Sequence, residues 1–450
     1  MNPKKVITRF APSPTGLLHG GNYRTAVFAY LFARKTGGEF IVRIEDTDAA
    51  RSKKEYEANI LEAIGWLGLE HSQLFRQSEH QPKHTLELQR LIESGHAYVS
   101  KETPTEEGQR AEVIRFRNPN EPVAFVDVIR GLISVDTTDL GDFVIARSLT
   151  EPVFHFAVVV DDADEGVTHI IRGEDHISNT PRQVLIQRAL GYETPKYAHL
   201  PLVLGPDKAK LSKRRGAKAL TQYRDEGFLP EAMINYLTLL GWHPEGEQEI
   251  FTVDDLVEIF TLERIQKSAG IFDEVKLRWF NHEHIKRLTD VEFIAHMEEF
   301  VSKSSVALPA YFPKVAGLLR ERVETLLEAQ NALQSGEFSF MEGDIAYEAE
   351  LLTKGAKADV EVVKKHLAEV HDMFSNILSP DGTPDTSEFT ADVAKAVVFP
   401  YATEQGRAQV LWPLRVALSG KEKSPDPFTL CGLLGKEIVQ SRIEQALKLL

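Results

Sequence analysis

The feature that most constrains the fold is an alternation of short strands and helices that begins at the amino terminus. The pattern predicts a strand at Val6–Phe10, a loop rich in proline and glycine at Pro12–Gly21, and a helix at Asn22–Arg34. A second predicted strand, Phe40–Ile44, leads directly into an acidic cluster that starts at Glu45. Such an alternation predicts a parallel sheet that binds its ligands at the carboxyl ends of its strands.

The alternation is interrupted once, resumes, and then gives way to helices. From Gln81 to Glu151 the pattern favours short β-rich pieces, which indicates an insertion. Predicted strands at Phe154–Val160 and Thr168–Ile171 resume the alternation. Beyond about Asp225 nearly every segment has helical period, so we expect the second half of the chain to be α-helical. The clearest helical segments are Pro230–Leu240, Asp254–Phe260, Lys314–Leu333 and Val360–Ile377.

Composition excludes several classes of protein. The chain has 450 residues and a formal net charge of -15, and an acidic chain is unsuited to coating nucleic acid by neutralising phosphates. Its single cysteine, Cys431, excludes an intramolecular disulfide and a cysteine-rich zinc finger. The first residues lack the apolar core of a signal peptide, and no apolar run reaches the roughly 18 to 20 residues that span a bilayer. We therefore expect a cytoplasmic protein of several domains.

Two segments carry residue types that bind a polyanion. In the first, His19 and the adjacent Gly20 and Gly21 stand where the loop turns into a helix. Small residues let the backbone approach a phosphate, and a helix start adds oriented N–H groups and a positive dipole end. Alone, this segment favours an ordinary turn that carries a surface histidine.

The second segment is a basic loop flanked by glycines. Residues Gly205 to Arg224 hold seven lysines and arginines against one acid, although the whole chain is acidic. A charge run is usually a solvated surface loop. However, a loop that swings would let Lys210 and Lys213 clamp the phosphates as pyrophosphate departs. The two segments together predict a nucleotide site, because they lie in order at the two ends of an interrupted α/β sheet.

The two segments resemble the signature motifs of class I aminoacyl-tRNA synthetases. The surrounding sequence narrows the resemblance to the bacterial glutamyl-tRNA synthetases through TRFAPSPTGLLHGGNYRTAVFAYLFAR, GGEFIVRIEDTD, VVVDDADEGVTHIIRGEDHISNTPRQ and KLSKRRGA. The likeness runs nearly from end to end. It implies an α/β Rossmann-like catalytic domain, whose parallel sheet is interrupted by an acceptor-stem-binding insertion, followed by an all-α anticodon-binding region.

The same resemblance implies how the chain divides into domains. Two stretches would form the halves of the catalytic domain, with the insertion between them, and two helical domains would follow. The expected ranges are 1–80 and 153–209 for the catalytic halves, 81–152 for the acceptor-end insertion, 210–300 for the signature loop and stem contact, and 301–450 for anticodon binding.

By resemblance the chain is an ATP-dependent glutamate–tRNA ligase that forms glutamyl-adenylate from L-glutamate and MgATP, then transfers glutamate to the 3′ end of tRNA(Glu). The implied catalytic residues are His19, Gly21, Lys210 and Lys213, and the implied ATP contacts add Asn22, Leu211 and Ser212. The implied glutamate-binding residues are Arg9, Ala11, Ser13, Glu45, Phe154 and Arg172. Glutamate carries one ammonium and two carboxylates, so an acid and two arginines suit it chemically.

The sequence departs from these relatives in two places. Phe154 stands where relatives commonly have a tyrosine that borders the glutamate pocket, so one hydroxyl contact is missing. The segment between Val99 and Ile114 is shortened and lacks a stretch that carries a small zinc site in many relatives. With one cysteine in the chain, we expect no zinc and no other protein-held metal.

Three other polar groups have plain structural interpretations. Arg9, Glu45 and Arg172 would form surface ion pairs if they were not in the pocket, but all three fall at predicted strand ends. Asp161 and Asp162 are interpreted as a strand-end cluster that shapes a loop rather than as a metal site. The pair His282 and His284 has i, i+2 spacing, which separates the rings on a helix, so we interpret it as surface.

Several alternatives to a glutamate–tRNA ligase for tRNA(Glu) remain open at this stage. One is an enzyme that also charges tRNA(Gln). A glutamyl transferase that modifies a tRNA base is much shorter, and a nucleotidyltransferase of similar core would not need the helical tail from about Leu308. A catalytically inactive tRNA-binding protein predicts a damaged His19 or Lys213, and both residues are intact. The protein is expected to be a monomer without a membrane partner.

Overall fold

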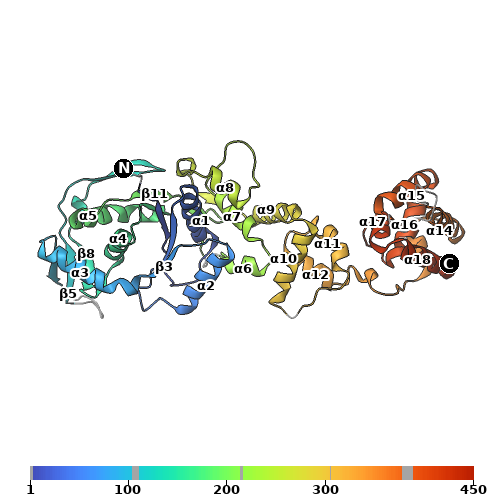
Figure 1. Cartoon of the computed structure of the whole chain (residues 1–450), viewed down its shortest axis with the longest axis horizontal. Helices are drawn as coiled ribbons and strands as arrows, with labels where there is room; N and C mark the ends of the chain where they lie inside the picture. Colours follow the sequence, from blue (N-terminus) through green and yellow to red (C-terminus); the bar gives the residue numbers. More distant parts are fainter. Residues whose placement is uncertain (1–3, 104–110, 213–215, 305, 378–388) are drawn as a thin grey trace. The chain divides into compact units, whose positions relative to one another are not determined.

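The amino-terminal alternation folds into a mostly parallel sheet of seven strands (Figure 1). The computed structural model describes residues 4–103, 111–212, 216–304, 306–377 and 389–450, which belong to two units, Met1–Arg287 and Leu288–Leu450. In sheet order the strands are β3 (Gln73–Arg76), β2 (Glu39–Ile44), β1 (Ile7–Phe10), β10 (His169–Gly173), β11 (Lys196–Leu200), β6 (Val123–Asp127) and β7 (Gly131–Val135). Only the β6–β7 pairing is antiparallel among these seven described strands.

Helices cover both faces of this sheet. The first loop leads into α1 (Gly20–Lys35), and α2 (Lys54–Trp66) connects β2 to β3. On the other side of the insertion, α4 (Phe154–Asp164) precedes β10 and α5 (Thr180–Leu190) precedes β11. The strands alternate between two cores, since Phe40 and Val42 pack with α1 whereas Ile41 packs with α4 and α5. Burial on both faces explains why these strands are continuously apolar.

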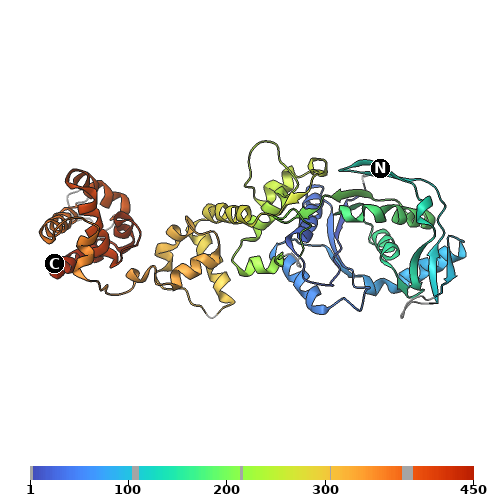
Figure 2. The ribbon, with the colours of Figure 1, turned by 180° about the vertical axis from the view of Figure 1, so that it is seen from behind.

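The insertion contains short strands, as expected, and part of it belongs to the central sheet. It begins with a helix, α3 (Gln81–Glu93), and its β6–β7 hairpin joins the edge of the central sheet, drawn in teal in Figure 2. The remaining strands form an antiparallel sheet of their own: β4 (Ala97–Lys101), β5 (Glu112–Phe116), β8 (Phe143–Ser148) and β9 (Glu151–Pro152). Strand pairing across the insertion is a long-range choice that local sequence does not encode.

The segment Phe154–Val160, predicted as a strand, is instead the start of helix α4. Its residues from Phe156 to Asp162 are buried without interruption. A short apolar run that is covered on all sides has no visible period, so strand and buried helix cannot be separated by pattern alone.

After the sheet, the first unit continues with a short parallel strand pair and helices. These elements are β12 (Val203–Leu204), α6 (Leu220–Asp225), α7 (Pro230–Leu239), α8 (Val253–Ile259), β13 (Gly270–Ile271) and α9 (Glu274–Arg287). His284 of α9 is buried and its Nε2 lies 3.0 Å from the Asn235 side chain, so the surface interpretation is wrong for this histidine.

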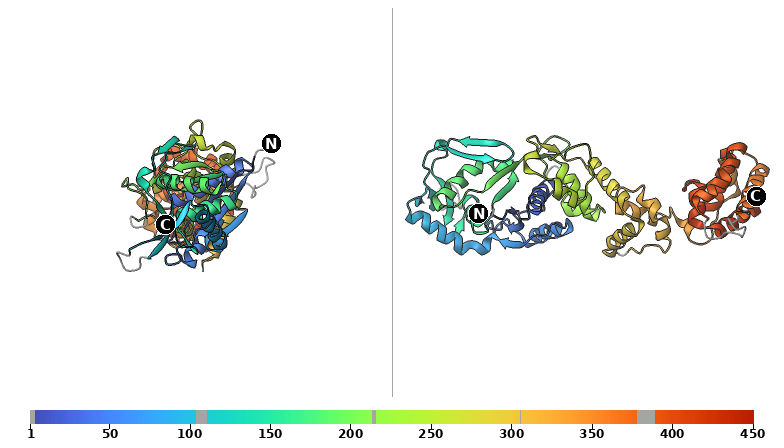
Figure 3. Two further views of the ribbon diagram at one scale, coloured as in Figure 1. Left: turned by 90° about the vertical axis from the view of Figure 1, so that its left-hand side faces the viewer. Right: turned by 45° about the horizontal axis from the view of Figure 1, so that its top comes forward.

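The second unit, Leu288–Leu450, is helical throughout its described residues (Figure 3). Its helices are α10 (Asp290–Ser302), α11 (Phe312–Arg320), α12 (Leu326–Gln334), α13 (Ala349–Lys354), α14 (Val360–Ser375), α15 (Ala391–Gln405), α16 (Arg407–Ser419), α17 (Pro427–Leu434) and α18 (Lys436–Leu449). The predicted helical segment Lys314–Leu333 is therefore two helices, because the Thr325 hydroxyl accepts from the Glu328 N–H and starts a new one. Across the part of the chain that the structure describes, no helix combines the length and apolar character needed to cross a membrane.

Gly38, just before β2, allows the first two strands to pair. A Cβ at this position would lie 2.2 Å from the Val6 carbonyl oxygen, which also accepts the Glu39 N–H at 2.8 Å. We predict that Gly38→Ala lowers the free energy of unfolding by about 2 kcal/mol or more, as strained backbone contacts do. Urea unfolding followed by circular dichroism measures this change. The control is Gly65→Ala in α2, where a Cβ meets nothing within 4 Å and stability should hold or rise. Equal stability of the two variants would contradict the assignment.

Candidate active site

A cavity of about 660 Å³ opens at the carboxyl ends of the central strands. The chain runs from β1 outward to β2 and β3 on one side, and from β10 outward to β11 on the other. The order therefore reverses between β1 and β10, and an open α/β sheet binds ligands at such a switch point. Arg9 lies on β1 and Arg172 on β10, so the two arginines flank the switch, and both line the cavity.

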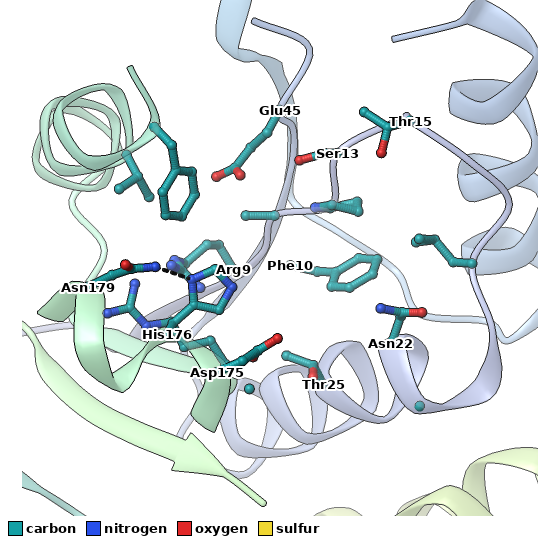
Figure 4. Close-up of a pocket in the computed structure, with 18 of the residues that line it drawn as sticks. Arg9, Phe10, Ser13, Thr15, Asn22, Thr25, Glu45, Asp175, His176 and Asn179 are labelled. Atoms are coloured by element: carbon teal, nitrogen blue, oxygen red, sulfur yellow. Dashed lines mark hydrogen bonds between the residues drawn. The ribbon is translucent and has the colours of Figure 1, made fainter. Parts of the chain in front are cut away.

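The structure brings most of the predicted residues to this cavity. It is lined by Arg9, Ala11, Ser13, Glu45, Phe154 and Arg172 from the expected amino-acid pocket, and by His19, Gly21, Asn22, Lys210 and Leu211 from the two signature segments. Figure 4 shows Glu45 and Ser13 on one side of the cavity and His176 and Asn179 on the other. The exceptions are Ser212, which lines a neighbouring cavity of about 380 Å³, and Lys213, which lies outside the described residues.

Arg9 is held in place by Asp162, a residue predicted to lie at the end of a strand. Its Nε donates to Asp162 Oδ1 at 3.0 Å, and both side chains are almost fully buried. Asp162 lies on the inner face of α4, and not in a loop at a strand end as predicted. Burial alone would raise the pKa of Asp162, but Arg9 and Arg43 outweigh it and hold that pKa below its ordinary value.

Asp161, the neighbouring acid, shapes the floor of the site from the same helix. Its Oδ2 accepts from Gln77 Nε2 at 2.7 Å, and its Oδ1 lies 2.6 Å from His84 Nε2. Gln77 in turn accepts from Thr47, and both residues line the cavity. Asp161 is thus a structural anchor, and within the described residues no group of three or more His, Cys, Asp or Glu side chains is arranged to hold a metal.

Arg43 is a buried arginine near the site that contacts several carboxylates. Its side chain has no exposed surface, and NH1 lies 2.9 Å from Asp162 and 2.6 Å from Glu165, while NH2 lies 3.3 Å from Glu45. One guanidinium therefore serves three carboxylates. Burial raises the pKa of Glu45, and it raises the pKa of Glu165 to about 7, because Arg43 cannot neutralise both in addition to Asp162.

Arg172 is buried in a different environment. Its NH2 group donates to Thr180 Oγ1 at 2.8 Å and to Gln183 Oε1 at 2.7 Å, and its Nε donates to His199 Nε2 at 3.1 Å. These three hydrogen-bond partners are neutral acceptors, and burial lowers the pKa of Arg172 to about 10. A buried guanidinium with neutral neighbours favours an anion that arrives with the ligand.

Phe154 forms part of the cavity wall at the start of α4. Its ring centroid lies 5.4 Å from that of His176 and 5.7 Å from that of His155. Val158, one helical turn later, lines the same wall. Burial lowers the pKa of His176 to about 4, so its imidazole is neutral at physiological pH. This wall therefore presents apolar and uncharged groups to a ligand.

The first signature segment sits at the start of α1. The Asn22 side chain accepts from the His19 backbone N–H at 3.2 Å and closes the first turn. A Cβ on Gly21 would lie 3.1 Å from the His19 ring and 3.2 Å from Val203, so a larger residue would displace the imidazole. The glycine is needed here for close packing beside the histidine, in addition to any approach of a phosphate.

The second signature segment starts from a short β-bridge. Lys210 is bridged to Leu204, and Leu211 N donates to the Val203 carbonyl at 2.9 Å. The Lys210 ammonium lies 2.9 Å from Asp175 Oδ2 in an exposed pair at the cavity. Exposed pairs of this kind are weak, so Lys210 can exchange Asp175 for a phosphate.

Sequence reasoning missed the residues that support the site from below. They belong to helices or strands whose local pattern signals burial and not chemistry. These residues are Arg43, Gln77, Asp127, Glu165, Thr180, Gln183 and His199. The available signal was the presence of charged residues inside apolar runs, such as Arg43 within Phe40–Ile44, because a buried charge requires a partner.

Comparisons with known proteins agree with this geometry. A family model described as "tRNA synthetases class I (E and Q), catalytic domain" matches residues 5–108 and 105–279, and a model described as "Anticodon binding domain" matches residues 292–447. The glutamate–tRNA ligase of Aquifex aeolicus is 40% identical over 99% of both chains, and that of Geobacter sulfurreducens is 39% identical over 98% of both. A crystal structure of a glutamate tRNA ligase from Elizabethkingia meningosepticum, in complex with its amino acid, is similar with a TM-score of 0.81, 29% identity and 99% coverage of both chains.

The raised pKa of Glu165 predicts how stability depends on pH. A carboxyl whose pKa is raised on folding contributes stability that is complete below its unfolded pKa and is lost as pH rises through about 7. Between about pH 6 and about pH 8 this group should cost the protein about 1 kcal/mol of unfolding free energy. Between these two pH values, Glu165→Gln should lose less unfolding free energy than the parent protein. Urea unfolding at both pH values measures the difference. The control is Glu70→Gln, whose side chain is exposed. Identical profiles for Glu165→Gln and the parent would disprove the role of this carboxyl.

Proposed function

The chain belongs to the family of class I tRNA synthetases for glutamate and glutamine, and we propose that the cavity at the β1–β10 switch is where it activates glutamate with ATP. Its function is that of a glutamate–tRNA ligase. The observation that carries the assignment of the site is its charge pattern: Glu45 faces a cavity that Arg9 and Arg172 also line. That pattern matches an ammonium and two carboxylates.

The pocket residues divide the groups of glutamate between them. Glu45 binds the ammonium, which supplies the cation that the carboxylates around Arg43 lack. Arg172 binds the side-chain carboxylate, because its guanidinium is buried among neutral acceptors. Arg9, held by Asp162, lies beside Arg172 and completes the positive side of the pocket. Ala11, Ser13 and Phe154 fit the pocket to the length of the substrate, and the phenyl ring offers no hydrogen bond.

ATP binds beside this pocket, over the start of α1. His19, Gly21 and Asn22 take the phosphates, where the helix contributes N–H groups and a positive dipole end. The α-carboxylate of glutamate attacks the α-phosphorus, the bond to the bridging oxygen breaks, and pyrophosphate leaves with that electron pair. Lys210 and Lys213, with Leu211 and Ser212 as loop contacts, stabilise the charge that develops on the departing phosphates.

Mg²⁺ enters as the complex with ATP. The described residues offer no cluster of three or more metal-binding side chains, so the ion would be held by phosphates and water. The contribution of this chain is to position the two substrates and to place positive charge at the phosphates.

The tRNA receives glutamate at its 3′ end, where a ribose hydroxyl attacks the adenylate carbonyl and AMP leaves. In our proposal residues 81–152 meet the acceptor end, 210–300 contact the stem and 301–450 read the anticodon, with 1–80 and 153–209 forming the catalytic halves. We further propose a cytoplasmic monomer that is specific for tRNA(Glu). An enzyme that also charges tRNA(Gln) is the alternative.

Aminoacylation of purified tRNA isoacceptors with labelled glutamate and glutamine tests the proposal. Labelled glutamate should appear on tRNA(Glu), and labelled glutamine on neither tRNA. Labelled glutamate on tRNA(Gln) as well would show that the enzyme charges both tRNAs and is not specific for tRNA(Glu). Absence of charging and of glutamate-dependent pyrophosphate exchange would point to the inactive tRNA-binding protein instead.

Arg172 should decide between glutamate and glutamine. Loss of one partner of a buried, charge-assisted pair costs about 3 to 5 kcal/mol, so glutamine should be rejected by roughly 10² to 10³ or more. We predict that Arg172→Ala raises the KM for glutamate by about 10² and narrows the glutamate-to-glutamine ratio in pyrophosphate exchange. The control is Arg188→Ala on α5, which removes an exposed arginine paired with Glu121. An unchanged KM and ratio for Arg172→Ala would show that the pocket is assigned to the wrong residues.

The chain should work without zinc. Its single cysteine is buried in α17, and the described residues show no cluster of metal-binding side chains. We predict that elemental analysis finds no stoichiometric zinc and that a zinc chelator leaves aminoacylation unchanged when Mg²⁺ is kept in excess. One zinc per chain would contradict this expectation.

A further inference from the structure

The geometry around Arg172 depends on a histidine that does not line the cavity. His199, on β11, has no exposed surface, and its Nε2 accepts from Arg172 Nε at 3.1 Å. An imidazole nitrogen accepts only when it carries no proton. This contact therefore requires the neutral tautomer of His199 with its proton on Nδ1, and another group must stabilise that tautomer.

Asp127, at the end of β6, is that group. Its Oδ2 lies 2.7 Å from His199 Nδ1 and accepts the His199 backbone N–H at 3.0 Å. Its Oδ1 accepts the N–H groups of Ile129 and Arg130. The carboxylate thus meets four N–H groups, which is the full capacity of its two oxygens. Because Asp127 only accepts, the proton of His199 stays on Nδ1 and Nε2 faces Arg172 as an acceptor.

The planes of the neighbouring groups are also fixed. The Tyr197 and His199 rings are stacked with an interplanar angle of 8°, and the Arg172 guanidinium lies 5.3 Å from the Tyr197 ring centroid. Thr180 and Gln183 hold the NH2 group of Arg172 from α5. The contacts of Arg172 come from α5 and β11, and the guanidinium cannot turn without losing several of them.

We infer that Asp127 and His199 are positioning residues that hold Arg172 in one orientation and thereby set the discrimination between glutamate and glutamine. The inference rests on the proposed function, since it takes Arg172 as the partner of the substrate side-chain carboxylate. Neither residue touches substrate. Burial lowers the pKa of His199, which is consistent with the neutral imidazole that the contact requires.

Rigidity is what makes the discrimination effective. With Nε and NH2 of Arg172 engaged, the N–H groups of NH1 remain for a ligand, and their direction is fixed. Either oxygen of a carboxylate can accept from NH1. A carboxamide offers one oxygen and an NH₂ group, and the NH₂ group would face a donor. A guanidinium that is free to turn would relieve this clash, so loss of the Asp127–His199 support should cost selectivity as well as affinity.

Asp127→Asn tests the inference with almost no change in volume. Asparagine cannot accept all four N–H groups, and the placement that loses fewest turns its NH₂ toward His199. His199 Nδ1 then accepts, the proton moves to Nε2, and two donors face each other at Arg172. In glutamate-dependent pyrophosphate exchange we expect the KM for glutamate to rise by about tenfold to 100-fold, as for a misplaced binding group. The KM for ATP should stay unchanged. The ratio of the exchange activity with glutamate to that with glutamine should decrease.

Two substitutions of His199 provide a second, independent measurement. His199→Gln retains an oxygen that reaches the Arg172 side, whereas His199→Leu has no acceptor. The inference is supported if the KM for glutamate and the glutamate-to-glutamine activity ratio lie closer to the parent values in His199→Gln than in His199→Leu. Equal KM values in the two variants, with equal thermal midpoints, would overturn it.

The matched control is Asn118→Ala in the same inserted region. Asn118 is buried and donates to the Thr137 carbonyl at 2.6 Å, so its loss disturbs the region without touching His199. Thermal unfolding should show destabilisation similar to that of Asp127→Asn, with KM and ratio unchanged. A control that alters KM and ratio as much as Asp127→Asn would mean that the effect is general destabilisation, which overturns the inference.

A double variant separates this inference from the assignment of Arg172. Once Arg172→Ala has removed the guanidinium, Asp127→Asn should add no further change in KM or ratio. If Arg172→Ala has no effect by itself, the proposed pocket is wrong. If Arg172→Ala has its effect but Asp127→Asn has none in a folded protein, the pocket stands and the positioning role alone fails.

Discussion

The architecture of the site depends on the buried contact between two arginines of the first strands and the carboxylates that face them. Arg43 of β2 has no exposed surface and contacts Asp162, Glu165 and Glu45, while Arg9 of β1 shares Asp162. Removal of one partner from such a network leaves a buried charge, at a cost of about 3 to 5 kcal/mol. Because Asp162 and Glu165 follow the insertion and Arg9 and Arg43 precede it, these ion pairs join the two halves of the sheet.

The same contacts give the cavity its chemical character. Around Arg43 the carboxylates outnumber the guanidinium groups, and burial, together with that excess, raises the pKa values of Glu45 and Glu165. Across the switch point, Arg172 donates hydrogen bonds to the neutral acceptors His199, Thr180 and Gln183. A pocket with unbalanced negative charge on one side and a guanidinium without a carboxylate partner on the other is complementary to an amino acid with an acidic side chain. The class of the enzyme and the electrostatics of its site therefore agree.

The β6–β7 hairpin is more than part of the insertion. Asp127 at its turn holds His199, and Arg130 pairs with Glu174, which accepts the Leu202 N–H at 2.8 Å. The hairpin thus supports both Arg172 and the segment that leads to the signature loop. The inserted region contributes a strand to the central sheet and contacts His199, which in turn contacts Arg172. Its removal or exchange would therefore alter the cavity that Arg172 lines.

The sequence by itself determined the alternating β and α elements, because these depend on local spacing. The two signature segments and the candidate arginines Arg9 and Arg172 come from the family resemblance that the sequence carries. Only the tertiary structure decided that Phe154–Val160 is helical and that β6 joins the central sheet. It also decided which groups hold the arginines. Asp127 and His199 are 72 residues apart, and a contact over that separation leaves no local pattern. The free energy of burying charges, which is set by distant partners, selects such contacts only when the whole sheet is assembled.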